Sequence, residues 1–252
     1  MLTSNEQVTK KNKAPGIDKV LGAFFLDIGL LGFFWFVGMI LITAIWTLCV
    51  YLANTGTIPN PQPSQWATML MGISSLYFSI LIVGGARGRN LSLNPIPASR
   101  TYLAVLAITT GLAVCLLTML CTYVLHYLGF ELHPGNQALL QETGKTTPAI
   151  IGFLTLVIAP IFEELLFRKQ LFTRFLVAGY TITGYLLSSV LFALMHEPTP
   201  TEGLVRWCLM LLLYAAMGAV FAWVYQKTGR LWPAILAHAS NNLLAVGILL
   251  LA

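Results

Sequence analysis

Charge is scarce in this chain of 252 residues, since only 9% of them are Asp, Glu, Lys or Arg. A typical soluble domain has roughly 25%, and no polar stretch here is long enough to form one. The four cysteines lie in apolar segments and show neither a disulfide framework nor the spacing of a Cys-type metal site. The net charge of +5 comes from loop residues and does not indicate nucleic acid as a partner. These deficits exclude a soluble domain and a disulfide-rich secreted one.

Long apolar segments dominate instead, and hydrophobic residues make up 57% of the chain. A membrane-spanning helix needs ~20 mostly apolar residues, and seven segments approach or exceed that length. They are Leu21–Ala53, Trp66–Gly84, Thr101–Leu128, a fourth that begins at Pro148, Tyr180–His196, Trp207–Gln226 and Leu231–Leu251. The sequence therefore predicts an all-α, polytopic transmembrane helical bundle of about seven spans.

Basic residues indicate how the bundle is oriented. With the N-terminus inside, all of the 14 Lys and Arg except Lys145 and Arg206 fall on the inner side, as the positive-inside rule requires. The first apolar run exceeds the ~7–15 residues of a signal-peptide core, so we interpret it as an uncleaved anchor. We expect a multi-pass membrane protein, with an inner basic segment at 1–20, N-terminal helices at 21–147 and a C-terminal group of helices at 148–252.

Two adjacent glutamates, Glu163 and Glu164, interrupt the fourth apolar segment. An ionisable residue at membrane depth is expensive and marks a functional site by default. Successive helical residues project about 100° apart, so we expect the two carboxylates not to face the same partner. Glu164 precedes Arg168 by four residues, which is the favourable order for a helical ion pair. This predicts that Glu164 is structural and that Glu163 faces the bundle interior. Residues 169–180 are basic and amphipathic, and either continue this helix or lie in the inner interface.

Two later segments also carry polar residues at helical spacing. His196 follows Phe192 by four residues, and Asn242 follows His238 by four, with Asn241 as a competitor on a neighbouring face. A carboxylate, two imidazoles and a carboxamide that converge on one pocket can carry out general-base hydrolysis, in which water is activated and the oxyanion is held.

The order of these motifs resembles a known family. Glu163-Glu164-x-x-x-Arg168, Phe192-x-x-x-His196 and His238-x-x-x-Asn242 follow one another on successive segments, as they do in the CPBP family. That family comprises the type II CAAX prenyl proteases and their bacterial relatives, including bacteriocin-immunity (Abi) proteins. The resemblance covers roughly Pro148–Leu251, and the N-terminal segments match only as generic membrane helices.

The resemblance implies an intramembrane endopeptidase that cleaves a peptide bond near the cytoplasmic membrane face. It makes residues 148–252 the catalytic core and places the protein in a bacterial plasma membrane. It makes Glu163 the base that activates water, with His196 as its partner, and assigns the oxyanion site to His238 and Asn242. The supporting residues are Glu164, Arg168 and Phe192. The implied partners are membrane lipid and a peptide or membrane-protein substrate, which need not be prenylated because bacterial relatives need not have a prenylated substrate.

Two questions stay open at the level of sequence. Glu163, His196 and His238 would suit zinc with an open fourth position, but Asn242 is a poor zinc ligand, so we favour catalysis without a cofactor. The alternative to an enzyme is a membrane immunity or scaffold protein that binds a peptide or partner through the same pocket. A transporter with a proton relay is a weaker alternative, because paired unwound helices are not indicated.

Overall fold

The computed structural model describes residues 15–53, 93–130, 132, 152–197, 199–200 and 203–251, and within these ranges all regular structure is helical. The predicted all-α class is thus confirmed for the described residues. The predicted span Trp66–Gly84 lies outside them, as do the start of the fourth span at Pro148 and most of the N-terminal segment. Seven spans and the inside position of the N-terminus stay predictions.

Among the residues that the structure describes, three helices are long and apolar enough to cross a membrane: Ile17–Cys49 within α1 (Ile17–Ala53), α3 (Arg100–Tyr127) and α9 (Leu204–Thr228). A shorter apolar helix, α8 (Thr181–His196), precedes α9, and α10 (Leu231–Leu251) follows it. Large apolar side chains such as Leu116, Leu117 and Leu120 of α3 are exposed. Lipid is the environment in which such a surface is favourable, because the bilayer interior is as apolar as these side chains.

The fourth predicted span departs from a regular α-helix. It runs through η1 (Leu154–Ile158), α6 (Ala159–Glu163), η2 (Glu164–Phe172) and α7 (Thr173–Val177), and η1 and η2 are wider π-helical turns. Residues 169–177 therefore continue the helix, which is the first of the two predicted alternatives. Short π-helical segments inside α-helices are rare and occur frequently at functional sites. Here η1 precedes the glutamate pair, and η2 begins at its second member, Glu164.

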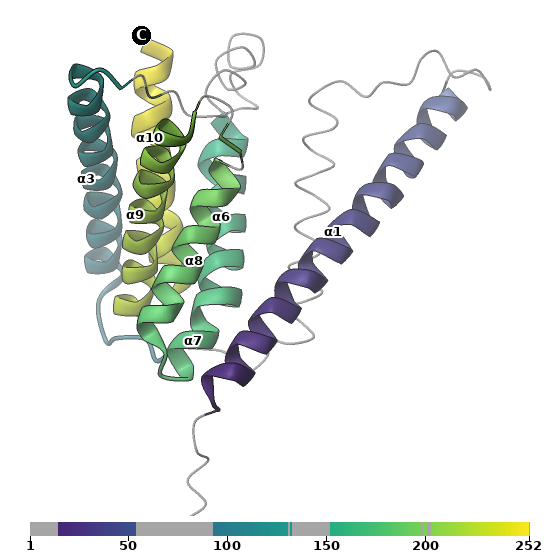
Figure 1. Cartoon of the computed structure of the whole chain (residues 1–252), viewed down its shortest axis with the longest axis horizontal. Coiled ribbons are helices and arrows are strands. Elements are labelled where there is room, and N and C mark those ends of the chain that lie inside the picture. Colours follow the sequence, from purple (N-terminus) through teal and green to yellow (C-terminus); the bar gives the residue numbers. More distant parts are fainter. Residues whose placement is uncertain are drawn as a thin grey trace, which may run out of the picture. The chain divides into compact units, whose positions relative to one another are not determined.

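Helices α3, α8, α9 and α10, together with η1, α6 and η2, form one compact unit (Figure 1). Within it α10 packs against α3, α9, η1 and η2, while α8 packs against α9 and η2. A Cβ atom at Gly111 of α3 would lie 2.0 Å from the carbonyl oxygen of Ala237. Glycine is thus what allows α3 and α10 to approach backbone to backbone.

A second glycine ends α9. Gly229 is the C-cap, with a left-handed φ of 65°, and its N–H donates to the Tyr225 carbonyl. Such a conformation at a helix C-terminus is typical of glycine. A Cβ atom there would also lie 2.3 Å from the Asn94 carbonyl oxygen, so the turn that leads into α10 needs glycine for two reasons. This turn sets where α10 begins, and α10 carries His238 and Asn242.

The other unit contains α1 and residues 174–180. Asp27 of α1 is fully buried and forms an ion pair with Arg174, and the ring of Phe24 packs edge-on against Phe175 at 5.0 Å. Burying a carboxylate is tolerated when it is paired. The pair therefore explains how α1, which is otherwise largely exposed, can carry a charged residue near its N-terminal end.

Candidate active site

Elements from three parts of the sequence bring the predicted site residues together. Glu163 is the last residue of α6 and Glu164 the first of η2, whereas His196 ends α8 and His238 lies in the second turn of α10. Both glutamates and His238 are buried, and Glu164 is fully inaccessible. The helices that carry them contact one another within the same compact unit.

Glu163 lies between two imidazoles. Its Oε2 atom is 3.7 Å from Nε2 of His196 and 3.9 Å from Nε2 of His238. These separations exceed the 2.7–3.2 Å of a direct hydrogen bond, and this buried oxygen has no hydrogen-bond partner among the described residues. A buried carboxylate oxygen without a partner is costly. The Glu163 oxygen therefore faces two imidazole nitrogens at separations too long for a direct hydrogen bond.

His196 is held by its own helix. Its Nδ1 lies 2.9 Å from the carbonyl oxygen of Phe192, and a carbonyl can only accept, so Nδ1 carries the hydrogen. In the neutral ring Nε2 therefore has the lone pair, and Nε2 is the atom that faces Glu163. The ring of Phe192 also contacts the imidazole, with centroids 4.5 Å apart, which gives the Phe-x-x-x-His motif a local structural reason.

The predicted ion pair between Glu164 and Arg168 is confirmed, with Nε and Oε2 3.1 Å apart. Their alignment does not meet hydrogen-bond geometry, so the attraction is chiefly between charges. Arg168 also donates from Nη2 to the Gly218 carbonyl at 2.8 Å, and its guanidinium lies 4.8 Å from the ring centroid of Phe192. Arg168 therefore joins η2 to both α8 and α9.

One geometric prediction about the glutamates is wrong. His238 contacts both of them, because its Nδ1 lies 3.0 Å from Oε1 of Glu164 while its Nε2 lies 3.9 Å from Oε2 of Glu163. The prediction considered only the 100° between successive α-helical residues. It did not consider that an imidazole has nitrogens on two edges, or that the register changes to a π-helix at Glu164.

Asn242 lies one helical turn beyond His238. Its Nδ2 donates to the Thr155 carbonyl at 2.9 Å, and its Oδ1 accepts from Nδ2 of Asn241 at 3.1 Å. The amide thus connects α10 to η1, the π-helical turn that precedes α6. The predicted neighbour Asn241 is buried and acts on Asn242, which its place on an adjacent face of α10 allows.

Sequence reasoning missed Tyr214. This residue of α9 stacks on the His196 imidazole, with ring centroids 4.6 Å apart and planes inclined by 25°. It missed Glu197 too, which is buried and paired with Arg206 at 3.7 Å, while the Glu197 carbonyl accepts from the Trp207 indole. Tyr214 lies in an apolar helix without a polar pattern, so only the folded structure could identify it.

The donor set can be compared with zinc. Two imidazole nitrogens and a carboxylate are common zinc ligands. Ligand atoms about 2.1 Å from a tetrahedral zinc lie roughly 3.4 Å from each other, and the Glu163 oxygen is 3.7 and 3.9 Å from the two nitrogens. Across the described ranges, no group of three or more His, Cys, Asp and Glu side chains has the geometry to hold a metal ion. As arranged here, the residues do not fit zinc.

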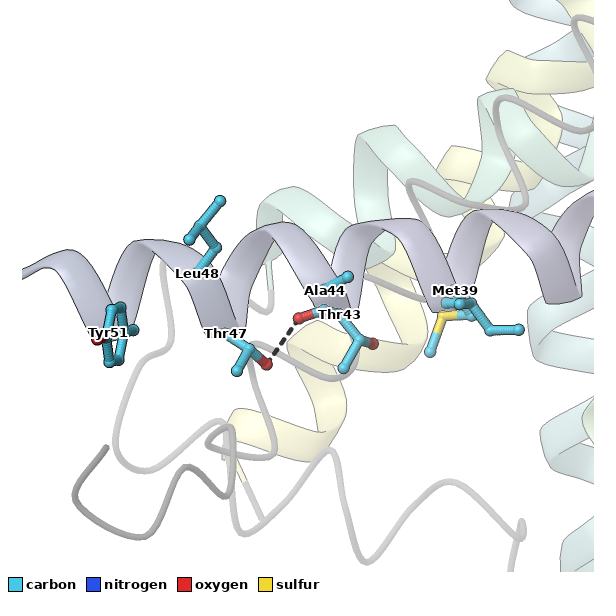
Figure 2. A pocket seen from close by; sticks show the side chains of 7 residues that line it. Met39, Thr43, Ala44, Thr47, Leu48 and Tyr51 are labelled. Carbon is cyan, nitrogen blue, oxygen red and sulfur yellow. Dashed lines mark hydrogen bonds between the residues drawn. The ribbon is translucent and has the colours of Figure 1, made fainter. Parts of the chain in front are cut away.

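A separate hollow lies along α1 and differs chemically from the glutamate site. Figure 2 shows side chains on successive turns of α1, where the Thr47 hydroxyl donates to the Thr43 carbonyl at 2.9 Å. The lining residues are Met39, Ile40, Thr43, Ala44, Thr47, Leu48 and Tyr51. None of these described lining residues carries a carboxylate or an imidazole, so they offer no base comparable to Glu163.

Comparison with known proteins gives two matches. Residues 145–244 match the family described as type II CAAX prenyl endopeptidase Rce1-like. A segment of 111 residues is 31% identical to the candidate membrane peptidase YdiL of Bacillus subtilis (strain 168), covering 44% of this chain and 41% of that protein. The chain thus spans less than half the length of this curated relative. No solved structure matches.

All three motifs lie within the matched residues. The apolar helices and the membrane relative together identify an integral membrane protein. The predicted resemblance to the CPBP family, which includes the type II CAAX prenyl endopeptidases, is thereby confirmed for residues 145–244.

Proposed function

We propose that the protein is an intramembrane endopeptidase that hydrolyses a peptide bond near the cytoplasmic membrane face. The observation that carries this proposal is the position of the buried Glu163 oxygen, 3.7 and 3.9 Å from the facing nitrogens of His196 and His238. A base within reach of a water molecule, flanked by groups that can donate to an oxyanion, is the minimum set for such hydrolysis.

Glu163 and His196 activate the water. A water oxygen about 2.8 Å from each of two atoms can bridge the 3.7 Å between them. Its proton passes to the Glu163 carboxylate, while the lone pair at Nε2 of His196 accepts its second hydrogen and orients it. The water oxygen adds to the peptide carbonyl carbon. The tetrahedral intermediate then expels the amine, which receives the proton from Glu163.

His238 and Asn242 stabilise the oxyanion. Ionised Glu164 can only accept, so Nδ1 of His238 donates to it at 3.0 Å. His238 can then donate from Nε2 to the oxyanion only as an imidazolium, and the Glu164 carboxylate stabilises that charged ring. Asn242 contributes a neutral amide N–H. The two donors lie one turn apart on α10, so one helix presents both to the same carbonyl oxygen.

The supporting residues hold this arrangement. Glu164 is shared between His238 and Arg168, and Arg168 is anchored to the Gly218 carbonyl and the Phe192 ring. A preorganised set of this kind does not have to rearrange when charge develops in the transition state. We propose that the reaction uses no metal, because Glu163 and the two histidines are spread wider than the ligands of a tetrahedral zinc.

The test compares peptides from membranes that contain the wild-type protein with those from membranes that contain the Glu163→Gln variant. We expect a set of cleaved membrane peptides that depends on Glu163, with equal amounts of folded protein in both. The matched control is Glu142→Gln, which removes a carboxylate between the predicted third and fourth spans and should leave the cleavage pattern unchanged. Identical peptide profiles for wild type and Glu163→Gln would refute the enzymatic proposal and would favour a non-catalytic immunity or scaffold role.

A further inference from the structure

The Thr155 carbonyl in η1 has no helical partner, and the reason lies in the sequence. In an α-helix the N–H of Ala159 would donate to it, but that N–H donates to the Leu154 carbonyl in the π register. The π-register donor to Thr155 would be the N–H of residue 160. Residue 160 is proline, which has no N–H. Pro160 is buried and Thr155 is half-buried, and neither helical donor is available to this carbonyl.

Asn242 supplies the missing donor from another helix. Its Nδ2 lies 2.9 Å from the Thr155 oxygen, and because a carbonyl only accepts, this contact determines which end of the amide is nitrogen. Asn241 confirms the assignment by donating to Oδ1 at 3.1 Å. One N–H and the oxygen of the amide are therefore committed. The second N–H is left for another acceptor.

We infer that Pro160, because it has no N–H, leaves the Thr155 carbonyl open to the Asn242 amide and thereby positions the amide that stabilises the oxyanion. The inference rests on the proposed function. Pro160 lies three residues before Glu163 on the same helix, so the bond from Asn242 to Thr155 connects the helix of the base with the helix of the oxyanion donors. Pro160 and Asn241 are positioning residues, since neither needs to touch the substrate.

Replacement of Pro160 by alanine tests this. Alanine provides an N–H that competes for the Thr155 carbonyl and releases the Asn242 amide. The substrate is a fluorogenic peptide taken from the strongest Glu163-dependent cleavage site. On it, Pro160→Ala should lower kcat about tenfold and leave KM unchanged. This decrease is smaller than the ~100-fold or larger decrease expected when an oxyanion donor is removed. The matched control is Pro233→Ala, in the first turn of α10, where the new alanine N–H would have no helical acceptor. It should leave kcat unchanged.

The decisive measurement is the same replacement in an Asn242→Ala background. If Pro160 acts through Asn242, there is then no amide to release, and Pro160→Ala should change kcat less than about twofold. An equal loss in both backgrounds, or full activity of Pro160→Ala, would overturn the inference. Asn241→Asp offers an independent variant, because it removes the donor to Oδ1 and should also lower kcat without raising KM.

A stability measurement does not depend on the substrate. Asn242→Ala leaves the Thr155 carbonyl without a partner and should lower the thermal unfolding midpoint in detergent. Adding Pro160→Ala supplies a new N–H for that carbonyl and should recover part of the lost stability. No recovery would contradict the proposed hydrogen-bond exchange. If wild type and Glu163→Gln cleave alike, the proposed function fails, yet this stability cycle still reports on the bond.

Discussion

The two adjacent glutamates give a sharp prediction, because the same isosteric change should have opposite consequences at each. Glu164 is fully buried, with His238 at 3.0 Å and Arg168 at 3.1 Å. Removing one partner of a buried ion pair costs ~3–5 kcal/mol, since the other charge stays buried. Glutamine keeps an oxygen that can accept from His238, so we expect Glu164→Gln to cost about 3 kcal/mol.

Glu163 should respond differently. Its Oε2 makes no hydrogen bond among the described residues, and the two histidine nitrogens are 3.7 and 3.9 Å away. Glutamine removes a buried charge and breaks no direct bond, so we expect the free energy of unfolding to change by less than about 1 kcal/mol. Peptide cleavage, in contrast, should be abolished, because an amide cannot accept the proton of the attacking water.

Thermal unfolding of the purified protein in detergent, followed by circular dichroism, measures the stability side of this prediction. For a chain of this size, about 3 kcal/mol corresponds to a midpoint roughly 6–12 °C lower. Glu164→Gln should show this shift, and Glu163→Gln should unfold at the wild-type temperature. Equal shifts for the two variants, or an active Glu163→Gln, would refute the division of the pair into one structural and one chemical carboxylate.

Three further predictions concern the surroundings of the site. Tyr214→Phe keeps the ring that stacks on His196 at 4.6 Å and should retain activity within about threefold. Tyr214→Leu should lower kcat about tenfold or more, because the His196 imidazole is then less well oriented for catalysis. Equal kinetics for the two variants would contradict this. Gly111→Ala should destabilise the protein by about 1–3 kcal/mol in thermal unfolding, because its Cβ would lie 2.0 Å from the Ala237 carbonyl oxygen. The control Gly29→Ala, with nothing within 4 Å, should not. Cleavage should survive a saturating chelator; loss of turnover that zinc restores would show that the metal-free mechanism is wrong.

Sequence reasoning could find the motifs because the paired residues of each motif lie four positions apart on an apolar helix. That spacing correctly predicted the Glu164–Arg168 pair, and it placed His196 on the face of Phe192. It assumed α-helical geometry throughout, however, and so it failed where the helix is not α. A π register begins at Glu164, and the four-residue spacing of the motifs carries no signal for it.

Tertiary packing decided the partners that lie far apart in the chain. Nothing in the pattern of α9 distinguishes Tyr214, because its function depends on contact with a residue of α8. The same holds for Asn242 and Thr155, which are 87 residues apart and meet only because α10 packs against η1.

By itself the sequence determined the all-α membrane class, the helical segments that fall within the described residues and the chemical groups of the candidate site. Scarce charge and long apolar runs leave few alternatives to membrane helices, whose backbone groups must be satisfied internally. The tertiary structure decided how those groups meet: His238 between two carboxylates, Tyr214 against His196, and Asn242 on a carbonyl that Pro160 leaves open. Periodicity records which face a side chain occupies within one helix, whereas these contacts depend on how separate helices pack and where their registers change.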